Sequence, residues 1–205
     1  MAIGRRAALE LDWSIEPGPG RRSVVLEPML RTRCDDERRA GPLAGPRHAG
    51  RSRIVIELFV PLAVLAGGLA AGGLMISALG GAPLLLSLPP DRYLPVHKFL
   101  VTRFDPFMPI CLLTALVGDL LIVVFAPAAT SRALAGAGAV IYAAVVYISL
   151  TKNVPINKWI GTLDAIPEGW ERIDPRERWK NWNLARTTLA VLALVCNVVV
   201  VGSLI

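Results

Sequence analysis

Four long runs of apolar residues dominate the chain, and stretches rich in polar residues separate them. The runs cover residues 54–79, 106–126, 132–151 and 184–205. Each is close to the roughly 20 residues that an α-helix needs to cross about 30 Å of hydrocarbon. The pattern predicts an all-α fold, a bundle of four transmembrane helices with short interfacial helices in the two long connections.

Composition supports a membrane protein, because 54% of the residues are hydrophobic and the mean hydropathy is +0.52. The first apolar run begins only at Ile54, behind an Arg-rich stretch, so it is not a secretory signal peptide. The first span would act as its own insertion signal. We expect a multi-pass protein of the cell membrane.

The N-terminal segment, residues 1–53, contains eleven Arg, no Lys and several Gly-Pro runs. This composition predicts disorder, ahead of a transmembrane domain at 54–205. Two interpretations stay open: an ordinary basic tail, or a translation start placed too far upstream. The basic charge favours membrane lipid as a partner and not nucleic acid, because no soluble module interleaves aromatic and basic residues.

The two long connections lie on one side of the bilayer, the loop side, because the number of spans is even. Residues 91–104 predict a short interfacial helix, and Asp105-Pro106 predicts the start of the second span. Residues 153–182 hold four of the five Trp, as in an interfacial aromatic belt. More Lys and Arg lie near the spans on this side, which favours a cytoplasmic loop side.

His97 shares a predicted helix face with Leu100, Val101 and Phe104. Such a His is either a packing residue or, with an ordinary pKa near 6.5, a general base. A lone His with three scattered Cys forms no ligand pattern, so we expect no metal.

Asn153 and Asn157 flank Pro155, which predicts a turn at the membrane surface. Either the two amides terminate and cap helices, or they bind an oxygen atom of a substrate.

A third candidate group lies at the entrance of the last span, where helical spacings of three, four and seven predict one stripe of residues: Trp179, Trp182, Asn183 and Arg186. An aromatic wall that ends in a cation would hold a flat anionic ligand. The alternative is that Arg186 reaches lipid headgroups beside an aromatic belt.

Polar residues inside spans are costly, about 2.5 to 3.5 kcal/mol for an ionised carboxylate at the centre of a span. Asp119 and Asn197 are expected at similar depth, with Glu57 nearer the surface, and the three would form a second polar cluster of unknown role. The alternatives are a hydrogen bond between Asp119 and Asn197, and a surface position for Glu57.

Small residues recur at every fourth position in two spans. Gly68 and Gly72 form a GxxxG pair in the first, and Ala135, Ala139 and Ala143 follow each other in the third. Such faces let helices approach closely, either within a compact bundle or in a homo-oligomer.

The order of these motifs resembles a family of small four-helix membrane proteins that includes fungal and bacterial anthrone oxygenases. Many members of that family are catalogued only as a domain of unknown function. The resemblance covers residues 54–205. It depends on the elements Val96-His97, Arg103-Phe104-Asp105, Phe107-Met108-Pro109, Asn153-Val154-Pro155-Ile156-Asn157, Arg178-Trp179, Trp182-Asn183 and Arg186.

The resemblance implies a cofactor-independent oxygenase that oxidises a planar phenolic, polyketide-like substrate with molecular oxygen. His97 would remove a C–H proton, while Asn153, Asn157 and Arg186 would stabilise the resulting enolate oxygen. The Trp residues would stack on the rings. The alternative is a non-catalytic membrane module that binds lipid, a quinone-like molecule or a partner helix. The catalytic interpretation requires a cavity that joins His97 to Asn157 and Arg186.

Overall fold

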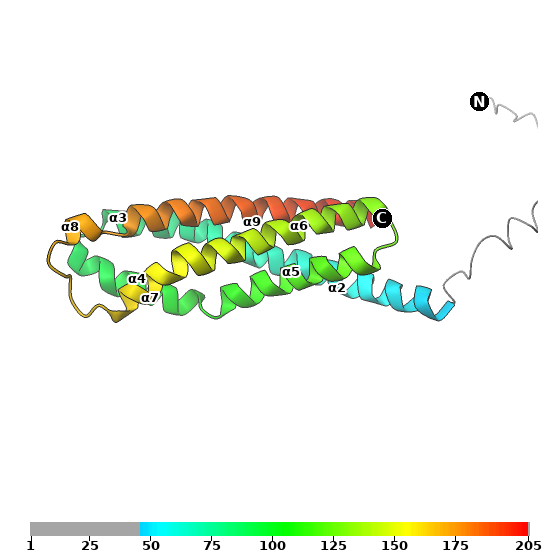
Figure 1. Cartoon of the computed structure of the whole chain (residues 1–205), viewed down its shortest axis with the longest axis horizontal. Helices are drawn as coiled ribbons and strands as arrows, with labels where there is room; N and C mark the ends of the chain where they lie inside the picture. The colour runs from blue at the N-terminus through cyan, green and yellow to red at the C-terminus, as the bar shows by residue number, and fades with distance from the viewer. Residues whose placement is uncertain (1–45, 205) are drawn as a thin grey trace, which may run out of the picture. The chain divides into compact units, whose positions relative to one another are not determined.

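The computed structural model describes the backbone of residues 46–204 and the side chains of residues 53–203. All regular secondary structure in this part of the chain is helical, and short links join the helices (Figure 1). In chain order the elements are α2 (Pro46–Ile76), η1 (Ser77–Gly81), α3 (Ala82–Ser87), α4 (Pro90–Phe104), α5 (Phe107–Phe125), α6 (Ala129–Ile148), η2 (Ser149–Asn153), α7 (Val154–Thr162), α8 (Trp170–Ile173) and α9 (Arg176–Leu204).

These helices join end to end into four long segments, which we call rods, and the rods form the bundle. All four are long and apolar enough to cross a membrane. They cover Arg53–Ser87, Phe107–Phe125, Ala129–Thr162 and Trp170–Ser203. The prediction of an all-α bundle of four spans is therefore confirmed. α2 begins at Pro46, inside the segment predicted to be disordered, whereas residues 1–45 lie outside the described part.

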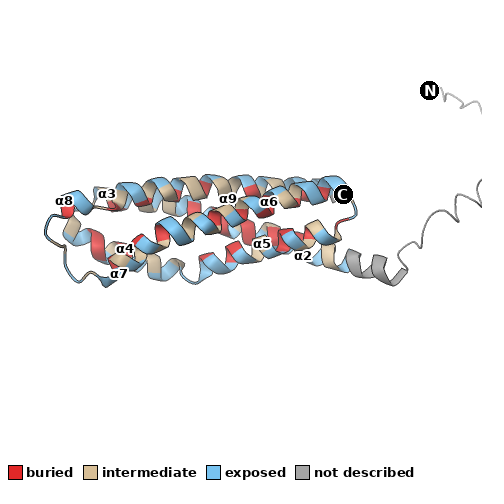
Figure 2. Cartoon of the chain, viewed as in Figure 1, coloured by how far each residue is buried: buried red, intermediate tan, exposed pale blue. Residues whose placement is uncertain are grey.

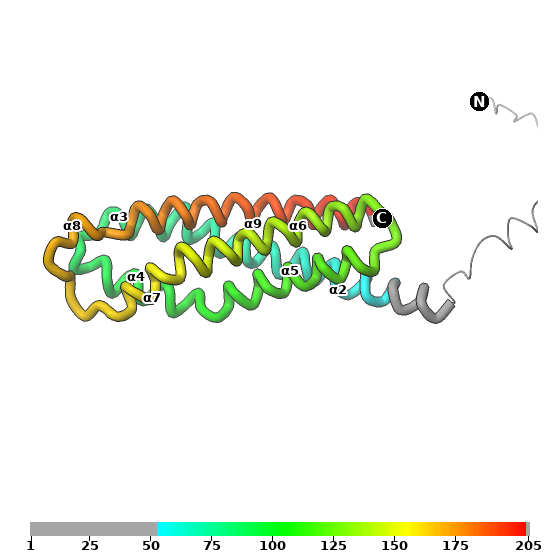
Figure 3. Tube along the Cα trace, viewed as in Figure 1, coloured from blue at the N-terminus to red at the C-terminus, as the bar shows by residue number. Residues whose placement is uncertain are grey.

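Only the second rod, with 19 residues, matches the bilayer thickness at about 1.5 Å per residue. The other three rods have 34 or 35 residues and extend well beyond that length. At one end of the bundle these extensions meet α4, which lies between the first and second rods, and α8 begins the fourth rod at this end (Figures 1 and 3). This end is the loop side.

Large apolar residues cover the outside of the bundle, and small residues fill much of its inside. On α5 the exposed positions recur every three or four residues as Ile110, Leu113, Val117, Leu120 and Val124. Buried positions recur along each of the long helices (Figure 2). Many of them are alanines, among them Ala66, Ala70, Ala115, Ala190 and Ala193. Because lipid is as apolar as Leu, close backbone approach drives this packing more than hydrophobic burial does.

The close contacts between helices only partly involve the small residues that the sequence predicted. A Cβ at Gly68 or Gly72 would meet nothing within 4 Å, so neither glycine is a helix contact of the bundle. The close contact is instead at Gly118 of α5, where a Cβ would lie 2.8 Å from that of Ala63 in α2. In the third span, Ala135 and Ala139 are buried as expected, whereas Ala143 is exposed.

The turn predicted at Pro155 is wrong, because the chain continues as helix from α6 through η2 into α7. The Val154 amide donates to the Ser149 carbonyl, the wider spacing of a π-helix. A proline in a regular helix clashes with the preceding turn, and the wider turn just before Pro155 accommodates the ring. The first rod repeats this arrangement, since η1 also begins with a serine, Ser77, and precedes a proline.

Two hydrogen bonds to backbone carbonyls outside the helices hold α4 against the rods. Its Lys98 ammonium donates to the carbonyl of Leu163, the residue after α7. The Arg176 guanidinium, paired with Asp174, donates to the Leu88 carbonyl in the short link that leads into α4. α5 begins at Phe107, one residue later than Asp105-Pro106 predicts, and no side chain caps it. These contacts position the inner face of α4 over the loop-side end of the bundle.

Candidate functional site

The candidate site is a cavity of about 410 Å³ at the loop side, where α4 meets the rods. Its volume falls within the range of small-molecule sites, about 300 to 1,000 Å³. Apolar side chains form most of its wall, including Leu74, Leu100, Phe104, Met108 and Leu112. Because Met108 and Leu112 belong to the first turns of α5, the cavity reaches from the loop-side end of that span into the bundle.

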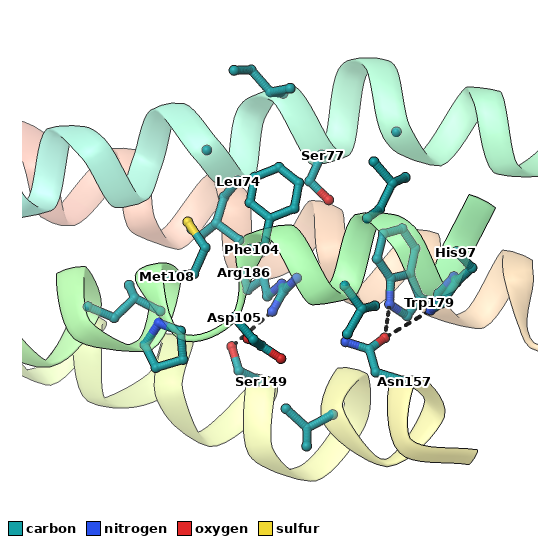
Figure 4. Close-up of a pocket in the computed structure, with 18 of the residues that line it drawn as sticks. Leu74, Ser77, His97, Phe104, Asp105, Met108, Ser149, Asn157, Trp179 and Arg186 are labelled. Carbon is teal, nitrogen blue, oxygen red and sulfur yellow. Dashed lines mark hydrogen bonds between the residues drawn. The ribbon is translucent and has the colours of Figure 1, made fainter. Parts of the chain in front are cut away.

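His97 is one polar residue of the wall, and its side chain is almost fully buried. Its Nε2 lies 3.2 Å from Oδ1 of Asn157, and the same oxygen accepts a hydrogen bond of 2.9 Å from Nε1 of Trp179. The imidazole also packs against the Trp179 indole, with ring centroids 5.4 Å apart. Side chains from three helices, α4, α7 and α9, therefore meet at this ring (Figure 4).

These contacts decide which nitrogen of His97 carries the proton. Oδ1 of Asn157 can only accept, so Nε2 of His97 must be the donor. Nδ1 is then the basic nitrogen, and it has no hydrogen-bond partner among the described residues. Burial lowers the pKa of His97, and the hydrogen bond to Asn157 raises it by a smaller amount. At neutral pH the ring is therefore uncharged and able to accept a proton.

A second polar group lies near the middle of the cavity (Figure 4). The Arg186 guanidinium donates to Oγ of Ser149 and twice to Oδ1 of Asn183. No carboxylate of the described region lies within ion-pair distance of it, although Asp105 also lines the cavity. A guanidinium has five N–H groups, so two remain for a ligand oxygen.

Of the seven residues predicted for this site, four line the cavity: His97, Asn157, Trp179 and Arg186. Asn153 and Asn183 are fully buried behind the wall, where they hold the Trp179 carbonyl and the Arg186 guanidinium, respectively. Neither Asn153 nor Asn157 caps a helix, because both lie within the continuous third rod.

Trp182 lies at the edge of the stripe of Trp179, Asn183 and Arg186, about 60° from Trp179 around the helix at about 100° per residue, and it does not line the cavity. It lines a separate surface groove of about 300 Å³.

Sequence reasoning missed three polar residues of the cavity. Asp105 was predicted only to begin the second span, and neither Ser77 nor Ser149 was predicted to be a site residue. Ser77 and Ser149 are the first residues of the two π-helices, and both line the cavity. π-helical turns inside longer helices occur frequently at functional sites, and the only signal for them was a proline six residues after each serine.

The predicted second polar cluster forms from Asp119 and Asn197, without Glu57. Both side chains are at most 1% exposed, and their polar atoms lack hydrogen-bond partners among the described residues. A Cβ at Gly138 would lie 2.5 Å from Oδ2 of Asp119 and 3.4 Å from Oδ1 of Asn197, so this glycine makes room for both. Glu57 is exposed and pairs with Arg53 at 2.8 Å.

The fold and the site define a class: a multi-pass integral membrane protein of four spans with a mostly apolar cavity at one end. Residues 99–196 match the family model described as anthrone oxygenase, so this part of the chain is anthrone oxygenase-like. Asn157, Trp179 and Arg186 lie within the match, and His97 lies just before it. Neither a curated protein nor a solved structure matches the chain.

Proposed function

We propose that the protein is an oxygenase that oxidises a planar, phenolic, anthrone-like substrate with molecular oxygen in the loop-side cavity. The observation that carries this proposal is the placement of a neutral His and a guanidinium without a paired carboxylate in one largely apolar cavity, most of which lies in the family-matched region. An acidic C–H group needs a base and a site for the developing negative charge, and the cavity offers both.

The reaction begins with transfer of a proton from the methylene carbon of the substrate to Nδ1 of His97. Nδ1 lies beneath the surface of the cavity wall, so the imidazole must turn toward the substrate for this step. The electron pair of the broken C–H bond moves into the rings and places negative charge on the substrate oxygen. The free N–H groups of Arg186 stabilise that oxygen, with Ser149 and Asn183 fixing the guanidinium.

Molecular oxygen then accepts electrons from the carbanion, a carbon–oxygen bond forms, and the His97 imidazolium returns its proton to give a hydroperoxide. The neutral imidazole removes the second proton from the same carbon, the O–O bond breaks to leave a carbonyl, and the departing hydroxide takes up that proton as water. One substrate and one O₂ thus become one quinone and one water. The apolar walls, including Leu100 and Phe104, favour both a flat aromatic substrate and dissolved oxygen.

The test is oxygen uptake by the purified protein in nanodiscs with a hydroxylated anthrone, after subtraction of the uncatalysed rate. We expect His97→Gln to lower kcat at least about 100-fold, the usual contribution of a general base. Arg186→Gln should lower kcat/KM, and Lys158→Gln, on the exposed face of α7, is the matched control. Asp105→Asn tests the other carboxylate of the cavity as the base.

Oxygen uptake at the uncatalysed rate in wild type would refute the proposal. If that protein still binds the anthrone, the non-catalytic alternative is favoured. Full activity in His97→Gln together with loss in Asp105→Asn would assign the base to Asp105. We further propose the cell membrane as the location, which fluorescence microscopy of a tagged chain would check.

A further inference from the structure

A second hollow lies on the outside of the bundle, between the third rod and α9, and the proposed oxidation does not use it. We call it the basic groove. Its volume is about 300 Å³, and it is lined by Thr151, Lys152, Pro155, Ile156, Trp159, Arg178 and Trp182. It contains Trp182, the residue of the predicted stripe that turns away from the cavity.

The groove carries two positive charges and no negative one. Lys152 and Arg178 are exposed, and neither forms an ion pair within residues 53–203, whereas Arg53, Arg176 and Lys180 each pair with a carboxylate. The Lys152 ammonium lies 5.2 Å from the centre of the Trp182 ring, a cation–π contact that holds it at the groove. Two cations without a counter-ion in one hollow favour an anion with several oxygens, such as a phosphate.

The position of the groove along α9 indicates the source of that phosphate. Arg178, Trp182, Ala185 and Leu189 follow each other at spacings of four, three and four, so they form one stripe of the helix. Along the stripe the side chains change from a cation to an indole to apolar groups. This is the order of headgroup, interface and hydrocarbon in a bilayer. On the third rod, the residue just before Thr151 is the 62% exposed Leu150.

We infer that the basic groove binds the phosphate of an anionic phospholipid headgroup, with Lys152 and Arg178 as its ligands. The acyl chains of that lipid lie along the apolar surface toward the middle of the spans. Trp159 and Trp182 flank the headgroup at the level where indoles are favoured in membranes. This site is independent of the oxidation proposed above.

The experiment titrates the purified full-length chain with phosphatidylglycerol or phosphatidylcholine and counts bound lipids by native mass spectrometry. We expect tighter binding of one phosphatidylglycerol. The double variant Lys152→Gln/Arg178→Gln should weaken this binding about 30-fold, because each basic residue near an anionic headgroup contributes a factor of about five. The control Lys158→Gln/Arg172→Gln removes the same charge from exposed positions outside the groove and should change binding less than about threefold.

Equal weakening in both double variants would overturn the inference, because it would show attraction to the surface charge in general. Equal affinity of wild type for the two lipids would also overturn it, and this comparison needs no variant. A third arm adds inorganic phosphate at millimolar concentration. Retention of the bound lipid supports a headgroup site, whereas its release shows a site for the free anion and contradicts the proposed lipid.

Discussion

Replacement of Asn157 by Leu tests the hydrogen bonds that fix the base of the cavity. One oxygen of Asn157 accepts from Nε1 of Trp179 at 2.9 Å and from Nε2 of His97 at 3.2 Å. Leu has nearly the same shape but no acceptor, so both donors would lose their partner. The Trp179 side chain is 6% exposed and that of His97 is 1% exposed, so water cannot easily replace the lost bonds.

Leaving a buried donor without a partner costs about 1 to 3 kcal/mol. Two such donors give a loss of at least about 2 kcal/mol in the free energy of unfolding. For a chain of this size that corresponds to a fall in Tm of at least about 4 °C. Thermal unfolding in detergent, followed by the near-UV signal of the Trp residues, measures it.

The matched variant is Asn157→Asp, which keeps the acceptor and adds a negative charge. A carboxylate hydrogen-bonded to the imidazole favours the protonated ring, so the pKa of His97 should rise relative to wild type. NMR titration of the imidazole follows that change. A Tm of Asn157→Leu within about 1 °C of wild type would refute the proposed role of this acceptor, whatever the result for Asn157→Asp.

Two further outcomes follow from the same structure. Gly138→Ala should lower the stability by about 1 to 2 kcal/mol, since its Cβ would lie 2.5 Å from Oδ2 of Asp119 and overpacking outweighs the gain in helix propensity. Gly136→Ala in the same helix meets only Val123 at 3.7 Å and should not destabilise; similar Tm shifts in the two would contradict this packing. The pKa of His97 is lowered in the folded state, so the unfolded chain binds more protons below about pH 6.5, and stability should fall as the pH decreases below that value. His97→Gln should lose this part of the pH dependence, and a thermal unfolding series from pH 7.5 to pH 5 compares the two; parallel curves would contradict the assignment.

The apolar pattern of the chain was enough to predict the four spans and the side of the bilayer on which polar residues gather. The second span was predicted at residues 106–126 and observed as Phe107–Phe125, because hydrocarbon thickness fixes the length of an apolar run. His97, Asn157, Trp179 and Arg186 were recognised because polar and aromatic residues at the ends of spans stand out against an apolar background.

Which of those residues contact one another depends on how the helices pack, and the pattern did not predict it. His97 and Asn157 are 60 residues apart in the chain, and their contact depends on how α4 lies against α7. Lipid-facing and interior apolar positions look alike in sequence, so the pattern did not show that Trp182 faces outward while Asn183 is buried. The π-helices that carry Ser77 and Ser149 also shift the helix register locally, which no regular period predicts. Membrane thickness therefore determined the minimum length of the apolar helices, and the packing of their loop-side ends against α4 formed the cavity.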